Sequence, residues 1–177
     1  KDNTLQYDSS LNYYYGAKNH KDTLTVAGDA AIWMNNSTST TYENIDNLDA
    51  SSSTGSVILA GSTGSNLIIG SQGRSTLWGG YGQTSDTLQG GSGSDSFYLG
   101  CNAGADYITD SSSADKVIFY DSAMTCSDIA MDGTSLVIST ASNSSLTIAD
   151  WPEHDINTFQ LADRTQYALH NQSGTFR

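Results

Sequence analysis

The chain has 177 residues and a formal net charge of −12, and 17 of its 19 acidic residues are aspartate. Its seven scattered Lys and Arg residues argue against nucleic acid and anionic membranes as partners, and it has no 18-residue apolar run of the kind that inserts into a membrane. Abundant Gly, Ser, Thr, Asn and Asp fit either many short strands and turns or a disordered linker, and the regular spacing of Leu, Ile, Val, Trp and Tyr favours the strands. We therefore predict an all-β protein.

Short strands with a loose rhythm are predicted over residues 1–55. KDTLTV at 21–26 places Asp22 two residues before Leu24, and AIWM, ENIDNLDAS and SVILAG provide further strands. We expect a continuous β-solenoid from about residue 20. The chain starts without Met and without a signal-peptide hydrophobic stretch, so we expect it to be a piece of a longer protein.

A repeat runs through residues 56–121, where 13 of the 17 glycines lie between Gly55 and Gly104. Large apolar residues recur every 9 to 11 positions, and from the second onward each follows a polar residue by two or three positions. The apolar residues are Leu59, Ile68, Leu77, Leu88, Phe97, Ile108 and Ile118, and the polar ones are Asn66, Ser75, Asp86, Asp95, Asp106 and Asp115.

This segment resembles the nonapeptide G-G-x-G-x-D-x-U-x of RTX proteins, in which U is a large apolar residue. GGSGSDSFY at 90–98 matches every specified position, and GGYGQTSDTLQ at 79–89 matches with two inserted residues. GSTGSNLII and GSQGRSTLW are degenerate copies without the carboxylate, while GCNAGADYITD and SSSADKVIFYD are expected to form the exit of the array. The resemblance implies a right-handed parallel β-roll, with two nonapeptides per coil and the U side chain pointing inward.

The resemblance also implies calcium as the cofactor, held between stacked turns by aspartate carboxylates and backbone carbonyls. Since each turn faces the next but one, the candidate pairs are Asp86 with Asp106 and Asp95 with Asp115. Turn residues Gly90, Gly91 and Gly93 complete the candidate site. Asn66 and Ser75 remove carboxylates upstream, so we expect about two calcium ions. The alternative is that the aspartates only cap turns.

The flanking segments extend the resemblance. The stretch at 25–61, TVAGDAAIWMNNSTSTTYENIDNLDASSSTGSVILAG, resembles the strand-rich lead-in before RTX arrays of large bacterial surface proteins, and residues 122–177 resemble the haemolysin-type module that follows such arrays. MDGTSLVIST with SLTIADW, and then INTFQLADRTQYAL, predict antiparallel pairs that cap the roll. At Asp163-Arg164, Arg stands where the family has Gly, which disfavours a tight turn with positive φ.

Two further features leave alternatives open. Trp78 and Tyr98 are expected to lie side by side on the outer face, as an aromatic pair or as a ligand platform. Cys101 and Cys126 are either a disulfide or two free thiols.

The resulting functional hypothesis is a non-catalytic, calcium-stabilised module of a secreted or surface-bound bacterial protein that folds after export by type I secretion machinery. No G-x-S-x-G or H-E-x-x-H motif is present to suggest catalysis. The alternatives are an adhesive module that binds a host glycan or protein, the C-terminal tail of a secreted protease or lipase, and upstream turns that fold without metal.

Overall fold

The computed structural model describes residues 1–34, 40–100, 103–120, 126–140, 144–151, 156, 158–168, 171–172 and 175–176, with the backbone alone at 126–128 and from 171 onward. Cys101 lies outside these residues, so the question of its pairing with Cys126 stays open. Within the described part of the chain, no helix is both long and apolar enough to cross a bilayer.

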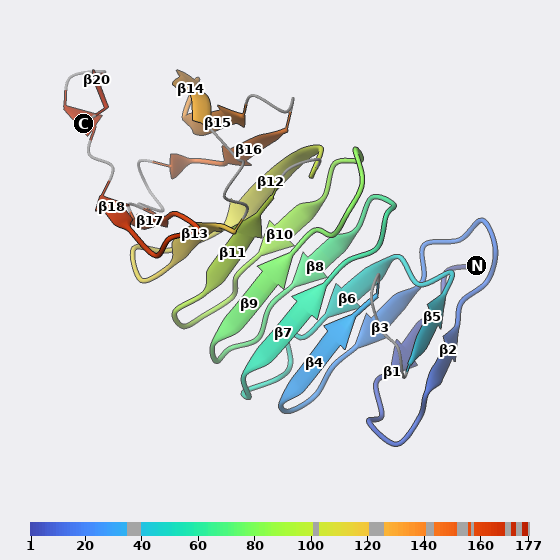
Figure 1. Cartoon of the computed structure of the whole chain (residues 1–177). Helices are drawn as coiled ribbons and strands as arrows, with labels where there is room; N and C mark the ends of the chain where they lie inside the picture. The colour runs from blue at the N-terminus through green and yellow to red at the C-terminus, as the bar shows by residue number, and fades with distance from the viewer. Residues whose placement is uncertain are drawn as a thin grey trace.

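Two sheets face each other, and the chain passes from one to the other as it advances (Figure 1). The first sheet has nine strands in the order β1 (Thr4–Gln6), β3 (Thr23–Thr25), β6 (Asn47–Asp49), β8 (Leu67–Ile69), β10 (Thr87–Gln89), β12 (Ala105–Asp110), β16 (Ser145–Ile148), β15 (Ser135–Thr140) and β14 (Cys126–Asp132). The second has seven in the order β18 (Gln166–Ala168), β17 (Thr158–Gln160), β13 (Lys116–Phe119), β11 (Ser96–Leu99), β9 (Ser75–Trp78), β7 (Val57–Ala60) and β4 (Ala30–Trp33). Two small pairs complete the fold, namely β2 (Tyr13–Tyr15) with β5 (Thr41–Glu43) and β19 (Asn171–Gln172) with β20 (Thr175–Phe176).

This arrangement is the predicted parallel β-roll. Every pairing between strands β1 to β13 is parallel, and from β6 to β13 each coil contributes one strand to each sheet. In the middle coils the paired residues are 20 positions apart, as in Leu67 with Thr87 and Thr87 with Tyr107. Two nonapeptide-like units therefore make one coil.

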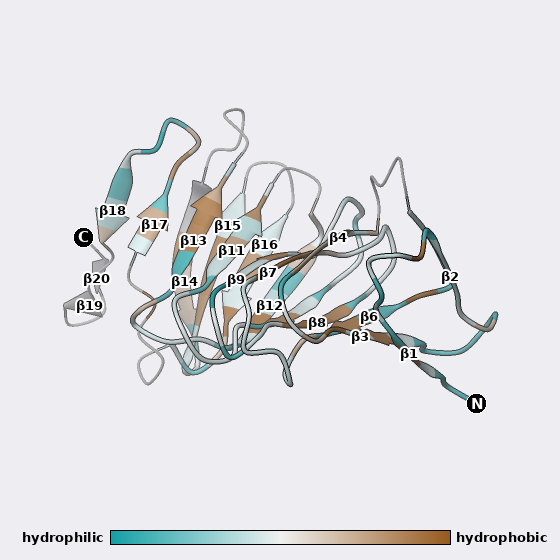
Figure 2. Ribbon diagram, turned by 90° about the horizontal axis from the view of Figure 1, so that it is seen from below, coloured by the Kyte–Doolittle hydropathy of each residue, from teal (hydrophilic) through white to brown (hydrophobic). Residues whose placement is uncertain are grey.

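The core lies between the sheets and is built on one inward residue per strand at matching register positions, joined by further buried side chains such as Val57, Leu99 and Phe119. Figure 2 shows hydrophobic segments in strands of both sheets. Side chains alternate across each strand, so only the middle residue of a three-residue strand points inward. The first sheet supplies Leu24, Leu48, Ile68, Leu88, Ile108 and Ile148, and the second supplies Ile32, Leu59, Leu77, Phe97, Val117 and Phe159. Such a core is thin, so the turns at its rims carry a large share of the stabilising contacts.

The apolar position assigned to Ile118 was wrong by one residue. Val117 pairs with Phe97 and is fully buried, whereas Ile118 pairs with Tyr98 on the opposite face of the strand. The step from Ile108 is therefore nine residues, which places Asp115 two residues before the inward position, as in the other turns. The VIF run hid this register because three adjacent apolar residues do not show which one points inward.

The solenoid also begins earlier than residue 20. Strand β1 pairs in parallel with β3, and Leu5 packs against the core opposite Leu24. The Tyr13–Tyr15 run alternates as expected, with Tyr14 buried and its neighbours about half exposed.

The C-terminal segment both continues the roll and closes it. β16 pairs in parallel with β12, and β17 pairs in parallel with β13, which adds one more coil. Antiparallel strands then attach to this coil: β15 pairs with β16 and β18 with β17, as the two predicted hairpins require. The hairpin of β14 with β15 was not predicted, because residues 131–140 were assigned to one strand and the structure turns at Gly133. The expected segments 1–55, 56–121 and 122–177 thus share two continuous sheets.

The turn between β17 and β18 is tight despite the missing glycine. Arg164 adopts a φ of 70°, its N–H donates to the Leu161 carbonyl, and the Asp163 carboxylate accepts from the Thr165 N–H at 2.8 Å. The tight turn with positive φ therefore forms although Arg stands at the position where the family has Gly. The hydrogen bonds of the hairpin hold Arg164 in a conformation that costs a non-glycine residue about 1–2 kcal/mol.

Candidate calcium site

The polar residue of each turn forms a stack along each rim of the roll. On the rim beside the first sheet, the Asn66 N–H donates to the Asp86 carboxylate at 2.8 Å, and the Asp86 N–H donates to the Asp106 carboxylate at 3.1 Å. On the other rim, the Ser75 N–H donates to Asp95 at 2.6 Å, and the Asp95 N–H donates to Asp115 at 2.7 Å. The structure thus brings together both predicted aspartate pairs, one coil apart.

These four carboxylates are buried, and no basic side chain in the described part of the chain forms a salt bridge with them. Each is at most 3% exposed, and the salt bridges found among the described side chains, His20–Asp2 and Lys21–Asp46, involve none of them. Buried carboxylates without an ion pair are costly to keep ionised. The stacks therefore either hold protons or need a cation.

The two oxygens of Asp95 differ in their surroundings. Oδ1 accepts a hydrogen bond from the Ser75 N–H, whereas Oδ2 is buried and has no hydrogen-bond partner among the described residues. In Asp115 both oxygens are used, since Oδ1 accepts from the Asp95 N–H and Oδ2 from the Ser112 N–H at 2.6 Å. The turn-capping interpretation therefore describes Asp115 well and leaves Asp95 Oδ2 unexplained.

The protonation equilibria reflect this burial. Loss of solvation raises the pKa of Asp86 and of Asp95 to about 6. At Asp106, loss of solvation and then the nearby charge of Asp86 raise the pKa to about 8. Burial also raises the pKa of Asp115.

Glycines let the turns stack at van der Waals distance. Gly91 and Gly93 have φ values of 86° and 114°, and a Cβ on either would lie within 2.4 Å of a carbonyl oxygen, from Ser71 or Gly73 respectively, in the turn below. A Cβ on Gly90 would lie 2.7 Å from Asp95 Oδ2. Backbone carbonyls and carboxylate oxygens therefore line the space between turns, and this is the kind of ligand that calcium prefers.

The upstream turns satisfy the same positions with amides and hydroxyls. The Asn66 amide donates to the Asp46 carbonyl at 2.5 Å and accepts from the Ser62 N–H at 2.6 Å. The Ser75 hydroxyl accepts from the Ser71 N–H at 2.9 Å and donates to the Gly90 carbonyl at 3.3 Å. These turns are closed by hydrogen bonds alone.

In the N-terminal turns, a buried aspartate is stabilised by several hydrogen bonds. Asp22 is fully buried and accepts hydrogen bonds from the N–H groups of Asn3 and Ala17. Burial acts to raise the pKa of Asp22, but these hydrogen bonds outweigh it and the pKa is lowered. The Asp22 N–H in turn donates to Asp46 at 3.1 Å, and the Lys21 ammonium lies 3.7 Å from that carboxylate. Sequence reasoning missed Asp46, although its spacing from Leu48 is the same as that of Asp22 from Leu24.

The described side chains contain no group of three or more His, Cys, Asp or Glu residues that could hold a metal ion. A calcium ion in the stacks would therefore depend on two carboxylates and on backbone carbonyls.

The outer aromatic residues lie elsewhere, on the second sheet. Trp78 and Tyr98 are register partners on β9 and β11. Trp78 is only 9% exposed because other aromatic rings cover it, among them Tyr81 at 4.6 Å between ring centroids. Tyr81 belongs to the longer loop of the 79–89 repeat, and the spacing alone did not show where that loop would fold.

The comparison with protein families agrees with this geometry. Residues 60–83 and 81–100 match the RTX calcium-binding nonapeptide repeat, with four copies. Residues 60–100 are RTX repeats. The match covers strands β8 to β11 and the turns that carry Asn66, Ser75, Asp86 and Asp95. No curated protein matches the chain.

Proposed function

We propose that the RTX repeats and the coil that follows bind Ca²⁺ between stacked turns, through Asp86 with Asp106 and Asp95 with Asp115. The observation that carries this proposal is the Asp95 carboxylate, which is 1% exposed and has one oxygen without a partner. Backbone carbonyls of the facing turns would supply the remaining ligands. A bound cation would supply the positive charge that the stacks lack.

The proposed role of calcium is to complete folding outside the cell. A net charge of −12 opposes compaction of a thin-cored chain in a calcium-poor compartment, which would keep it extended for export through a type I secretion channel. Extracellular calcium modules bind with dissociation constants of about 10⁻⁴ to 10⁻³ M. Each occupied site at millimolar calcium therefore adds roughly 1 kcal/mol of stability, which decides folding when the net stability is small.

The proposed module is structural and non-catalytic, and it belongs to a secreted or surface-bound bacterial protein. What supports a structural role is that the buried carboxylates lie between stacked turns, where backbone N–H groups use them as acceptors. The parent protein, whether an adhesin, a protease or a lipase, is a separate matter because the fold does not fix it.

Calorimetric titration and thermal melting followed by circular dichroism test the proposal. We expect about 5 mM Ca²⁺ to raise the melting temperature of calcium-stripped protein by at least about 5 °C. Mg²⁺ at the same concentration should have a much smaller effect, because it requires strict octahedral geometry. The double variant Asp86→Asn, Asp95→Asn should lose most of the gain. A melting temperature indifferent to calcium would reject the proposal and leave the aspartates as turn caps.

A further inference from the structure

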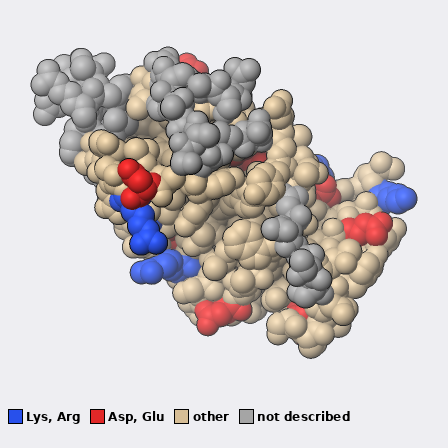
Figure 3. Space-filling model, in the orientation of Figure 1, with Lys and Arg blue, Asp and Glu red and all other residues tan. Residues whose placement is uncertain are grey.

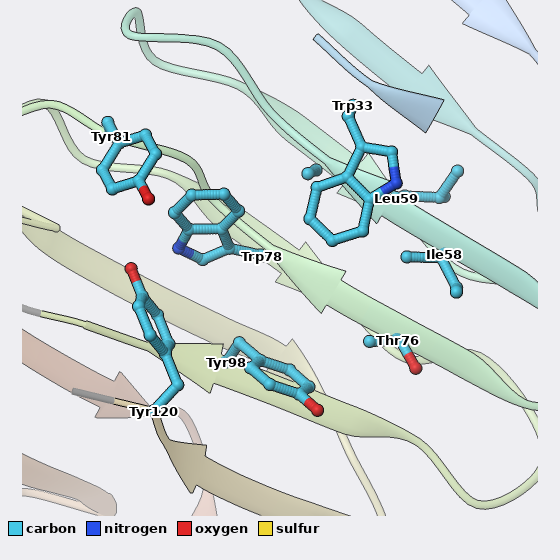
Figure 4. Close-up of a pocket in the computed structure, with 9 residues that line it drawn as sticks. Trp33, Ile58, Leu59, Thr76, Trp78, Tyr81, Tyr98 and Tyr120 are labelled. Carbon is cyan, nitrogen blue, oxygen red and sulfur yellow. The ribbon is translucent and has the colours of Figure 1, made fainter. Parts of the chain in front are cut away.

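A groove runs across the outer face of the second sheet, away from the stacked turns. Its volume is about 440 Å³, within the range of roughly 300–1,000 Å³ of small-molecule sites. The lining comes from strands β4, β7, β9 and β11 and from the loops after β9 and β13 (Figure 4). It consists of Trp33, Ile58, Leu59, Ala60, Thr76, Trp78, Tyr81, Tyr98 and Tyr120.

The floor of the groove holds a buried donor with no acceptor. Trp78 is more than nine-tenths buried, and within the part of the chain that the structure describes its indole Nε1 has no hydrogen-bond partner. The rings of Tyr81 and Tyr120 stand nearly perpendicular to the indole, at 4.6 Å and 5.7 Å between centroids. In Figure 4 the nitrogen edge of Trp78 points toward the hydroxyl ends of both tyrosines. One polar spot therefore lies within an otherwise apolar surface.

The walls of the groove are exposed aromatic rings. Trp33 is 42% exposed and meets Trp78 at 6.3 Å and 60°, and Tyr81 is 53% exposed at the other side. A group of large apolar rings that is exposed together on a protein surface often marks a site for a ligand or a partner. The Trp78 nitrogen itself is buried, so a ligand hydroxyl reaches it only when the exposed Tyr81 ring beside it turns aside.

None of the nine lining residues is charged, although the chain carries 19 acidic residues. Figure 3 shows the same pattern, since acidic and basic side chains do not gather over the middle of this face, in front of β7, β9 and β11. A cationic or anionic ligand would form no ion pair here. The polar side-chain groups present are two indole N–H groups, tyrosine hydroxyls and a threonine hydroxyl, all of them neutral.

We propose that this groove binds a neutral pyranose sugar. A sugar ring has an apolar C–H face that packs against an indole or phenol ring, and hydroxyl groups that both donate and accept hydrogen bonds. A sugar hydroxyl can accept from Trp78 Nε1, and the ring face can pack against Trp33 or Tyr81. A hydrocarbon chain would fill the same space and leave Nε1 buried and unpaired, which is costly.

Saturation-transfer NMR and calorimetric titration with maltose, cellobiose and lactose test this site. The protein is kept in calcium, and circular dichroism checks its fold, so the result does not depend on the proposed calcium sites. We expect at least one disaccharide to bind with a dissociation constant of about 1 mM. Trp33→Ala removes an exposed wall, and Trp78→Phe removes the donor while keeping a ring, so each should weaken binding at least about tenfold.

Tyr107→Ala is the matched control, because Tyr107 is 43% exposed on β12 of the other sheet, and it should leave binding unchanged. No contact with any of the three sugars at about 10 mM would overturn the proposal. Equal binding by wild type and Trp33→Ala would also overturn it. Preferential binding of tetramethylammonium would overturn it in favour of a cation, and a dimer that Trp33→Ala dissociates would overturn it in favour of a second copy of the chain.

Discussion

Three aspartates in equivalent turns show how local hydrogen bonds influence the pKa of a buried carboxyl group. Asp22 accepts several hydrogen bonds and its pKa is lowered, whereas Asp115 uses both oxygens and still has a raised pKa. Asp95 has one oxygen without a partner and a pKa of about 6. The need for a cation is therefore concentrated at particular residues rather than spread evenly over the repeat.

The Asp95→Asn variant should have opposite effects without and with calcium. In metal-free protein at pH 7.5 the amide removes a buried charge, and Asn66 shows that an amide fits this turn position. We expect the free energy of unfolding to rise by about 1–2 kcal/mol. The gain on adding calcium should shrink, because a ligand is lost.

Urea denaturation with and without calcium measures both effects. Asp163→Asn, in the exposed hairpin turn, serves as the control and should leave the calcium response unchanged. If Asp95→Asn retained the full calcium gain, Asp95 would not be a ligand.

The pH dependence of metal-free stability should run opposite to that of most acidic proteins. The native pKa values of Asp86 and Asp106, about 6 and about 8, lie above the unfolded value of 3.8. The native state therefore binds more protons between about pH 4 and pH 8. The resulting stability is fully present below pH 4 and is lost as the pH rises through 6 to 8.

Melting of calcium-stripped protein at pH 5 and pH 8 checks this sign. A two-unit shift at a single carboxyl corresponds to about 2.7 kcal/mol, so we expect a melting temperature at least about 5 °C lower at pH 8. Asp106→Asn should flatten the upper part of the profile. Calcium should reverse the slope, because it binds the deprotonated carboxylates. A metal-free melting temperature that rises with pH would contradict the burial of these groups.

Arg164→Gly should stabilise the terminal hairpin. Glycine adopts the φ of 70° without the strain that a side chain causes, which stabilises the folded state. Part of this stabilisation is lost because glycine also gives the unfolded chain more conformational entropy. We expect an increase of about 0.5–1 kcal/mol, measured by urea denaturation. Arg164→Ala is the control, since it removes the side chain and keeps the strain. An equal gain in both variants would mean that the side chain, not the backbone, is unfavourable.

At the scale of the coil, the two halves of the roll differ in how their rims are closed. Turns up to Ser75 are closed by hydrogen bonds from amides, from hydroxyls and from the backbone N–H groups that surround the buried Asp22 carboxylate. Turns from Asp86 to Asp115 bury carboxylates without a counter-charge. The first half can therefore fold without metal, and its edge strands are then available for the strands of the second half to pair with.

Amide hydrogen exchange should reveal this difference. In metal-free protein at pH 7.5 we expect amides of β6 and β8 to exchange at least about tenfold more slowly than those of β10 and β12 in the same sheet. Calcium should slow exchange in β10 and β12 and change β6 little. Equal protection in all four strands without calcium would mean that the roll closes as one cooperative unit independently of metal.

Much of this element order can be read from the spacing of residues. The structure confirms that the apolar residues from Leu59 to Ile108 point inward and that turns one coil apart lie together. It also confirms the two predicted antiparallel hairpins. The physical reason is that each nonapeptide specifies its own turn and strand locally. The calcium ligands themselves remain a prediction.

The parts that spacing did not reveal depend on distant contacts. Strand β1 becomes part of the roll by pairing with the edge strand β3, and β16 pairs with β12 although the two are far apart in the sequence. The β2–β5 pair and the position of Tyr81 over Trp78 likewise depend on which surfaces meet. A sequence read one segment at a time does not contain this information.

At the scale of the whole molecule, the coil is a unit that can be copied. Leu67 pairs with Thr87 and Thr87 with Tyr107, so a tandem duplication of residues 79–98 should insert one coil in register. We expect the folded protein to lengthen by about 4.8 Å, the spacing of paired strands. Small-angle scattering in calcium measures the change. Duplication of residues 90–98 alone is the control and should disrupt folding, because half a coil sends every later strand to the wrong sheet.

Because paired residues in the middle coils are 20 positions apart, adding or removing one coil changes the length of the roll by the same amount each time. A descendant gene with more or fewer repeats would hold the two ends of the chain at a different separation while keeping every local contact. Evolution can therefore change the length of such a solenoid by duplicating or deleting whole coils, without any new kind of side-chain packing.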